Sequence, residues 1–209
     1  MCIRDRVMAV CLALCACVEE PEYYPIPQAL KDWALYDYGS YWVYQNDSTG
    51  AVDSIYIAKI TFGKDSLWSD KKLKKIREVI RIEFHSSLGE LIHFADLRGE
   101  FYSDLTYYTY FANHKRLSSC ILLHVDAQGV IVDSTKYYIV SSRLNTLTIN
   151  SSTFNEVLQV NSTSRYYYSP NVVTQDTYWI SREGWIIKKT IYPSDEPESW
   201  SLLRNHTTQ

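Results

Sequence analysis

The feature that most constrains this fold is the repeated alternation of apolar and polar residues from residue 40 onward. Segment 40–45 reads SYWVYQ, and segment 53–61 reads DSIYIAKIT. Successive side chains of a β-strand point to opposite faces, so a period of two predicts half-buried strands rather than helices. The 18 Tyr and 6 Trp among 209 residues agree with this, because aromatic side chains favour strands.

Further strands are predicted along the rest of the chain. They are expected at 78–85, 90–95, 100–111, 119–125, 130–134 with 137–140, 153–163, 177–181, 185–192 and 200–205. Residues 126–129 predict a tight hairpin, and residues 182–184 predict another in which Gly184 is available for a positive φ. About ten hairpin-linked strands indicate a mainly β protein with a single antiparallel meander sheet. One side of such a sheet must be buried, so it should curve into a half-barrel or fold as a β-sandwich.

Helix is expected to contribute little, with at most one or two short helices. Residues 30–38 are compatible with one helical turn that places Leu30, Trp33 and Ala34 on a common face. No internal repeat is visible in the sequence, so residues 30–209 are expected to form a single β domain.

The first 17 residues have the pattern of a signal peptide. Residues 7–18 are uncharged and apolar, and a helix of this length would rise only about 18 Å, too short to cross a bilayer. The end of the run, Leu14-Cys15-Ala16-Cys17, resembles a bacterial lipobox. The resemblance implies cleavage before Cys17, acylation of its thiol and a membrane partner reached through this lipid anchor. The alternative is a buried apolar helix with incidental cysteines.

Two features flank this leader. Residues 1–6, MCIRDR, resemble translated adapter sequence, so the natural N-terminus is expected to differ. Residues 18–29, VEEPEYYPIPQA, contain three prolines and predict a flexible, extended tether. The two glutamates at its start are similar to the acidic tag that routes lipoproteins of Bacteroidota to the outer face of the outer membrane. A solvated linker explains them equally well.

Three segments resemble a group of uncharacterised Bacteroidota lipoproteins. Residues 39–44 carry a G-S-Y-W-x-Y opening strand, residues 153–158 read TFNEVL, and residues 178–189 form a closing hairpin, YWISREGWIIKK. The resemblance implies a β fold and an outer-membrane lipoprotein of the cell envelope, with possible exposure at the cell surface. It transfers no catalytic residue.

The net charge and the absence of known catalytic motifs argue against several classes of function. The net charge of −3 gives no footprint for nucleic acid, and the basic run at 71–77 is expected to be a solvated edge. The sequence contains no GxSxG, HExxH, P-loop or dinucleotide-binding motif, so neither an enzyme nor a cofactor is predicted. His85 and His93 could face each other across a hairpin and bind a metal, but two half-exposed strand histidines are favoured, and no metal site is predicted.

The candidate ligand surface consists of two tyrosine clusters, Tyr107, Tyr108 and Tyr110, and Tyr166, Tyr167 and Tyr168. Neighbouring strand residues point to opposite faces, so each cluster should present rings on both sides of the sheet. Exposed rings could stack on sugars or line an apolar groove. Ordinary cross-strand packing is the favoured alternative.

These observations predict an exported, lipid-anchored envelope protein with a non-enzymatic binding or structural role. One alternative is a half-barrel carrier of a lipid or other apolar ligand, which requires an apolar cavity on the concave face. Another is a surface glycan-binding module, which requires an exposed aromatic platform.

Overall fold

The computed structural model describes residues 20–69, 72–89, 91–100, 102–111, 116–166, 169–192 and 196–208. The predicted leader with Cys17, and also Tyr167 and Tyr168, lie outside the described residues. The elements are β1 (Glu22–Tyr24), α2 (Gln28–Ala34), β2 (Tyr41–Asn46), β3 (Val52–Ser69), β4 (Lys72–Ser86), β5 (Leu91–Arg98), β6 (Tyr102–Phe111), β7 (Arg116–Asp126), β8 (Ser134–Thr135), β9 (Tyr138–Ile149), β10 (Ser152–Tyr166), β11 (Ser169–Ser181), β12 (Trp185–Ile191) and β13 (Glu198–His206).

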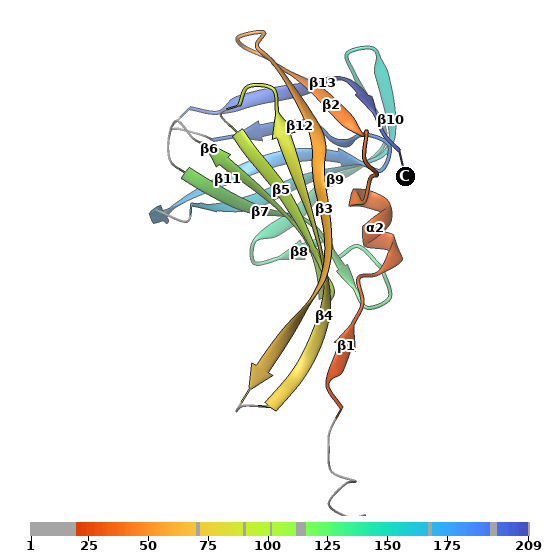
Figure 1. The fold of residues 1–209 in the computed structure, drawn as a ribbon. Coiled ribbons are helices and arrows are strands. Elements are labelled where there is room, and N and C mark those ends of the chain that lie inside the picture. The colour runs from red at the N-terminus through yellow and green to blue at the C-terminus, as the bar shows by residue number, and fades with distance from the viewer. Residues whose placement is uncertain are drawn as a thin grey trace, which may run out of the picture.

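The prediction of a mainly β, antiparallel meander is confirmed. All strands belong to one sheet in the order β11-β12-β13-β2-β3-β4-β5-β6-β7-β10-β9-β8, with β1 paired to β4 (Figure 1). Two hairpin-linked runs, β2 to β7 and β9 to β13, are joined by the pairing of β13 with β2. β11 also pairs with β10, and within the described residues β10 meets β7 through two residue pairs. The sheet is therefore strongly curved without closing into a barrel.

The core lies inside this curve and is rich in aromatic rings. Trp42 makes edge-on contacts with Tyr36 at 5.4 Å and with Phe84 at 5.9 Å between ring centroids. Trp185 lies 5.8 Å from Phe84. All the buried hydrophobic residues among those described, except Val43, form one continuous cluster, so the strands share a single core.

The helix α2 packs on this core with the predicted face. Leu30, Trp33 and Ala34 are the buried residues of α2, as the spacing of three and four residues requires. Among the described residues, no helix has the length and hydropathy that crossing a bilayer demands.

A long hairpin, the β3–β4 arm, projects away from the body of the sheet (Figure 1). We define the arm as residues 63–69 of β3 and 72–79 of β4, which pair from Gly63 and Val79 outward to Ser69 and Lys72. Every residue from 63 to 69 is exposed. The strand predicted at 53–61 therefore ends too early, because a ribbon exposed on both faces needs no apolar alternation.

Two turn predictions have different outcomes. The hairpin at 126–129 is confirmed: Asp126 Oδ1 accepts hydrogen bonds from the backbone amides of Gln128 and Val130, and Gly129 has a φ of 79°. At the other turn Gly184 does not take the positive φ; Trp185 does, at 60°. Gly184 is instead required by packing, because a β-carbon there would lie 2.5 Å from Ile187 Cγ2.

The segment after the 126–129 hairpin departs from the predicted strands. Only an isolated bridge between Val125 and Ile131 and the two-residue β8 occupy the region predicted as a strand at 130–134. β9 is much longer than the predicted 137–140. Its residues between Tyr138 and Ile149 are half-buried or exposed, so their composition carries little apolar signal.

Candidate functional site

Four exposed rings line up across four neighbouring strands, and we call them the aromatic row: Tyr41, Tyr56, His85 and His206. In the strand registers His206 pairs with Tyr41, Tyr41 with Tyr56, and Tyr56 with His85. Paired residues of adjacent antiparallel strands share a face of the sheet. The four rings, from β13, β2, β3 and β4, therefore form one continuous strip on the outer face.

The rings of the aromatic row form two contacting pairs and are open to solvent. Tyr41 and His206 lie 5.9 Å apart between centroids, and Tyr56 and His85 lie 5.5 Å apart. The Tyr56 hydroxyl is 3.3 Å from His85 Nδ1, within hydrogen-bonding distance. The exposed fractions of Tyr41 and Tyr56 are 38% and 47%, and both histidines are also exposed. Tyr38, exposed by 59%, borders the row and accepts a hydrogen bond from the Ile60 amide.

Strand alternation explains why these rings face outward. Trp42 follows Tyr41 and is buried in the core, while Ile55 and Ile57 on either side of Tyr56 are buried as well. Each tyrosine therefore lies on the solvent-facing side of its strand, while the residues next to it in sequence point into the core. The alternation of buried and exposed residues in each strand is visible in the sequence. Which exposed rings lie side by side, however, depends on the register of four strands.

The aromatic row offers a specific chemistry. Flat ring faces can stack on apolar surfaces, and the phenol and imidazole groups supply donors and acceptors at the edges. Neighbouring strands lie about 4.8 Å apart, so the row is an extended strip rather than a closed pocket. Such a strip suits an elongated ligand that combines apolar faces with hydroxyl groups.

The tyrosine clusters predicted from the sequence lie elsewhere. Tyr107 is buried in the core, with its hydroxyl 2.8 Å from His93 Nδ1. Tyr108 is half-buried and stacks on Phe94 at 4.3 Å between centroids. Both residues thus take part in cross-strand packing.

The side chains of the other tyrosines in the two predicted clusters are not among those that the structure describes. Tyr110 belongs to β6 and Tyr166 to β10, but the structure describes only their backbone. Tyr167 and Tyr168 lie outside the described residues.

The two histidines considered as metal ligands lie on opposite faces. His93 pairs with the buried Phe84, whereas His85 is exposed beside Tyr56. The residue that pairs with His93 is Phe84, one position before His85. Because neighbouring residues of a strand point to opposite faces, the two histidine side chains point away from each other. Over the described ranges, no cluster of three or more His, Cys, Asp or Glu side chains has a metal-binding arrangement.

Among the described residues, the concave face is filled around Trp42, where the carrier hypothesis requires a cavity. Trp42, Tyr44, Phe84, Tyr107 and Trp185 surround a narrow gap there with Ile55. That gap leaves no space for a water molecule. Close packing of this kind is ordinary core structure and provides no chamber for an apolar ligand.

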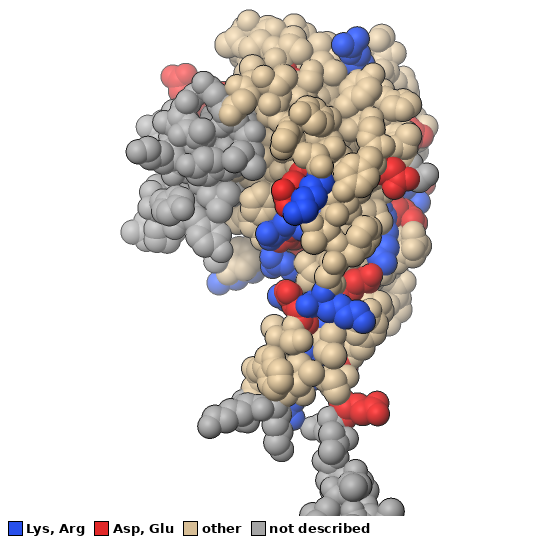
Figure 2. Space-filling model, viewed as in Figure 1, with Lys and Arg blue, Asp and Glu red and all other residues tan. Residues whose placement is uncertain are grey.

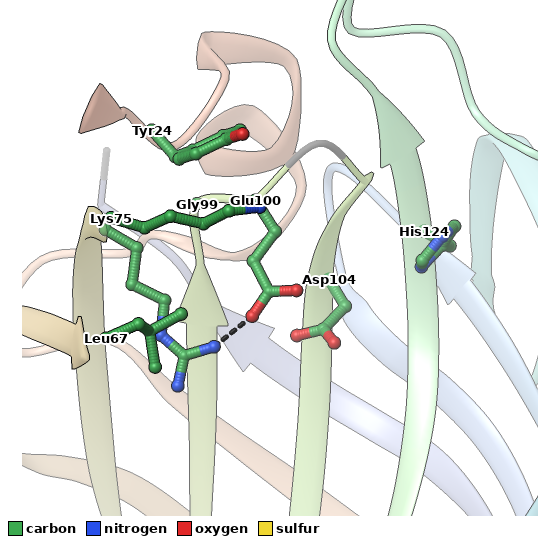
Figure 3. Close-up of a pocket in the computed structure, with 8 residues that line it drawn as sticks. Tyr24, Leu67, Lys75, Gly99, Glu100, Asp104 and His124 are labelled. Atoms are coloured by element: carbon green, nitrogen blue, oxygen red, sulfur yellow. Dashed lines mark hydrogen bonds and ion pairs between the residues drawn. The ribbon is translucent and has the colours of Figure 1, made fainter. Parts of the chain in front are cut away.

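A separate cavity of about 280 Å³ lies along one side of the β3–β4 arm, between the arm and the ends of β5, β6 and β7 (Figure 3). Its lining residues are Tyr24, Leu67, Lys75, Arg77, Gly99, Glu100, Asp104 and His124. Arg77 forms ion pairs with Asp65, at 3.1 Å, and with Glu100. Burial raises the pKa of Asp104 to about 6. The cavity is lined by both basic and acidic side chains, and Arg77 is already paired with Asp65 and Glu100. The charges around the cavity therefore favour neither an anionic nor a cationic ligand.

No family model, no curated protein and no solved structure matches this chain. The class of protein is therefore defined by the fold and the site: a mainly β protein with one curved antiparallel sheet and an exposed aromatic row on its outer face.

Proposed function

We propose that this chain is an exported, lipid-anchored protein of the cell envelope that binds carbohydrate without catalysis. The leader at residues 1–17 supports export, and the lipobox supports acylation of Cys17 and location at the outer membrane, with the β domain at the cell surface. The ligand class rests on the aromatic row.

The observation that carries the binding proposal is the exposure of the row's rings on four adjacent strands. A single exposed ring is common on protein surfaces, but a contiguous aromatic strip more often marks an interaction site. Tyr41 and Tyr56 occupy its centre, with an imidazole beyond each of them. A polysaccharide chain has both the apolar ring faces that stack on Tyr and the hydroxyls that bond to His and Tyr.

The close packing of the described interior around Trp42 favours this proposal over the carrier alternative. A carrier must enclose its ligand in an apolar chamber, whereas Trp42, Phe84 and Trp185 occupy the corresponding space. The glycan-binding alternative requires only an exposed platform.

Affinity electrophoresis tests the ligand class directly. The purified protein is run in native gels that contain soluble starch, xylan or a β-glucan, and we expect retardation in at least one of them. Tyr56→Ala and Tyr41→Ala should each weaken the apparent affinity by about tenfold, because each removes a central stacking surface.

Tyr23→Ala is the matched control, because Tyr23 is exposed by 49% but lies on β1, away from the row. It should migrate as the wild type in every gel. Unretarded migration of the wild type in all gels, or equal weakening by Tyr23→Ala, would overturn the carbohydrate proposal. Mass spectrometry of the mature N-terminus tests the anchor, with acylated Cys17 as the expected first residue.

A further inference from the structure

The N-terminal segment leaves the body along the β3–β4 arm. β1 pairs with β4 in parallel, with Glu22 beside Lys75 and Tyr24 beside Arg77. β4 runs from the end of the arm toward the body, so β1 must run in the same direction (Figure 1). The start of β1, at Glu22, therefore lies toward the end of the arm.

Side-chain contacts fasten β1 to the arm as well. The Lys64 ammonium lies 4.9 Å from the centre of the Tyr23 ring, and the Lys75 ammonium lies 5.0 Å from that of Tyr24. Cations placed over aromatic faces at this range are attracted to them. The direction of the tether is thus coupled to the direction of the arm.

The described end of the arm exposes an apolar pair, Leu67 by 39% and Trp68 by 65%. The other five tryptophans of the chain are buried or half-buried, so Trp68 is exceptional. Neutral residues make up most of the visible surface of the described arm (Figure 2). Trp favours the boundary between lipid and water, because its ring is apolar and its N–H needs a polar partner.

Basic side chains accompany this apolar pair. Lys64, Lys74 and Lys75 are exposed on the arm, where Lys64 and Lys75 also lie over the rings of Tyr23 and Tyr24. Lysines next to an interfacial Trp are suited to lipid phosphates. The sequence predicts a solvated edge for this basic run, and the structure places that edge beside the tether.

We propose that the end of the β3–β4 arm is a membrane-contacting foot, in which Leu67 and Trp68 enter the headgroup region of a phospholipid bilayer. The inference rests on the proposed acylation of Cys17. Cys17 precedes Glu22 by five residues, a span of at most about 17 Å when fully extended. The anchor therefore holds the end of the arm within reach of the bilayer that carries it.

The foot also sets the orientation of the aromatic row. Tyr56 and Trp68 lie on the same strand, twelve residues apart, which is at most about 40 Å along β3. With the foot on the membrane, the row is carried away from the lipid surface, where a polysaccharide can reach it.

Fluorescence quenching in vesicles tests the foot. The full, acylated protein is incorporated into vesicles of phosphatidylcholine and phosphatidylglycerol whose acyl chains carry bromine near the headgroups. We expect bromine to quench part of the tryptophan emission. Trp68→Phe should abolish that quenching, whereas Trp179→Phe, which alters a half-buried ring on β11, should retain it.

Flotation of the same vesicles separates the two proposals. Protein that fails to float with lipid lacks the anchor, which overturns the proposed acylation and the foot together. Protein that floats but shows no quenching, or quenching that persists in Trp68→Phe, overturns the foot alone.

Discussion

Gly99 lies so close to Tyr24 that a β-carbon at residue 99 would be 2.3 Å from the Tyr24 carbonyl oxygen. The same β-carbon would lie 2.8 Å from the backbone of Pro25. Both neighbours are main-chain atoms, which cannot rotate away as the end of a side chain can. The glycine that directly follows β5 therefore allows the end of β1 to pass close to it while β1 lies beside the arm.

We expect Gly99→Ala to displace β1 from the arm and to cost about 1–3 kcal/mol of stability, as overpacking of a close contact usually does. Limited chymotrypsin digestion should then cleave after Tyr23 faster than in the wild type; the bond after Tyr24 is resistant because Pro25 follows it. Gly63→Ala is the matched control, because a β-carbon there meets no atom within 4 Å. Equal cleavage rates in the wild type and Gly99→Ala would contradict the expectation.

A second prediction concerns Asp96, which is fully buried between two arginines. Its carboxylate accepts two hydrogen bonds from Arg81, both at 2.7 Å, and one from Arg98 at 2.9 Å. The carboxylate is buried, but the side chains of Arg81 and Arg98 are 48% and 29% exposed, so their charges stay solvated when it is removed. Loss of the charged hydrogen bonds should cost about 1.5–3 kcal/mol. Asp96→Ala should lower the urea midpoint accordingly.

Asp133→Ala provides the comparison for Asp96→Ala. Asp133 pairs with Arg143 on an exposed surface, where an ion pair contributes about 0–1 kcal/mol. Similar losses in the two variants would show that the burial of Asp96 does not govern its contribution.

The sequence alone predicts the strands that have one buried and one exposed face. In β2, Trp42 and Tyr44 fill the core while Tyr41 faces solvent, and this contrast is visible as alternation. The same reasoning fails for the arm, where residues 63–69 are exposed on both faces, and for most of β9. Where successive residues of a strand do not alternate between buried and exposed, apolar and polar residues do not alternate in the sequence, so the strand cannot be predicted from this pattern.

The candidate site was harder to predict than the strands. Tyr107 and Tyr108 form a cluster in the sequence and are therefore predicted as part of a ligand surface. In the structure Tyr107 is buried and Tyr108 stacks on Phe94. Tyr41 and Tyr56 stand apart in the chain and become neighbours only through the β2–β3 register. That register depends on the hydrophobic pattern of both strands and on the turn between them, which no single segment reveals.

A third prediction tests the packing at Gly184. A β-carbon there would lie 2.5 Å from Ile187 Cγ2 and 2.7 Å from Phe154 Cε1. Because both clashes involve side chains, Gly184→Ala should cost about 1–3 kcal/mol, and Phe154→Leu should relieve part of this cost when combined with it. Chemical denaturation of the wild type, both single variants and the double variant measures the coupling. Strictly additive losses would contradict a direct contact between residues 184 and 154.

The last prediction concerns the pH dependence that Asp104 gives to stability. Burial raises the native pKa of Asp104 from 3.8 to about 6, despite the opposing attraction of Arg98. Between about pH 4 and pH 6 the unfolded state therefore binds fewer protons than the native state at this group, and stability falls as pH rises. At neutral pH the native protein carries the full cost of a charged, half-buried carboxylate, on the order of 1–3 kcal/mol.

Asp104→Asn removes the titrating charge and should be more stable than the wild type at pH 7, but not at pH 4. Urea unfolding at both values measures the difference, and Asp37→Asn, which alters an exposed acidic residue, controls for the loss of one negative charge. The gain should develop between pH 4 and pH 6 because only there does the protonation of Asp104 differ between the native and unfolded states. A gain that is equal at pH 4 and pH 7 would mean that Asp104 acts through packing rather than through its charge.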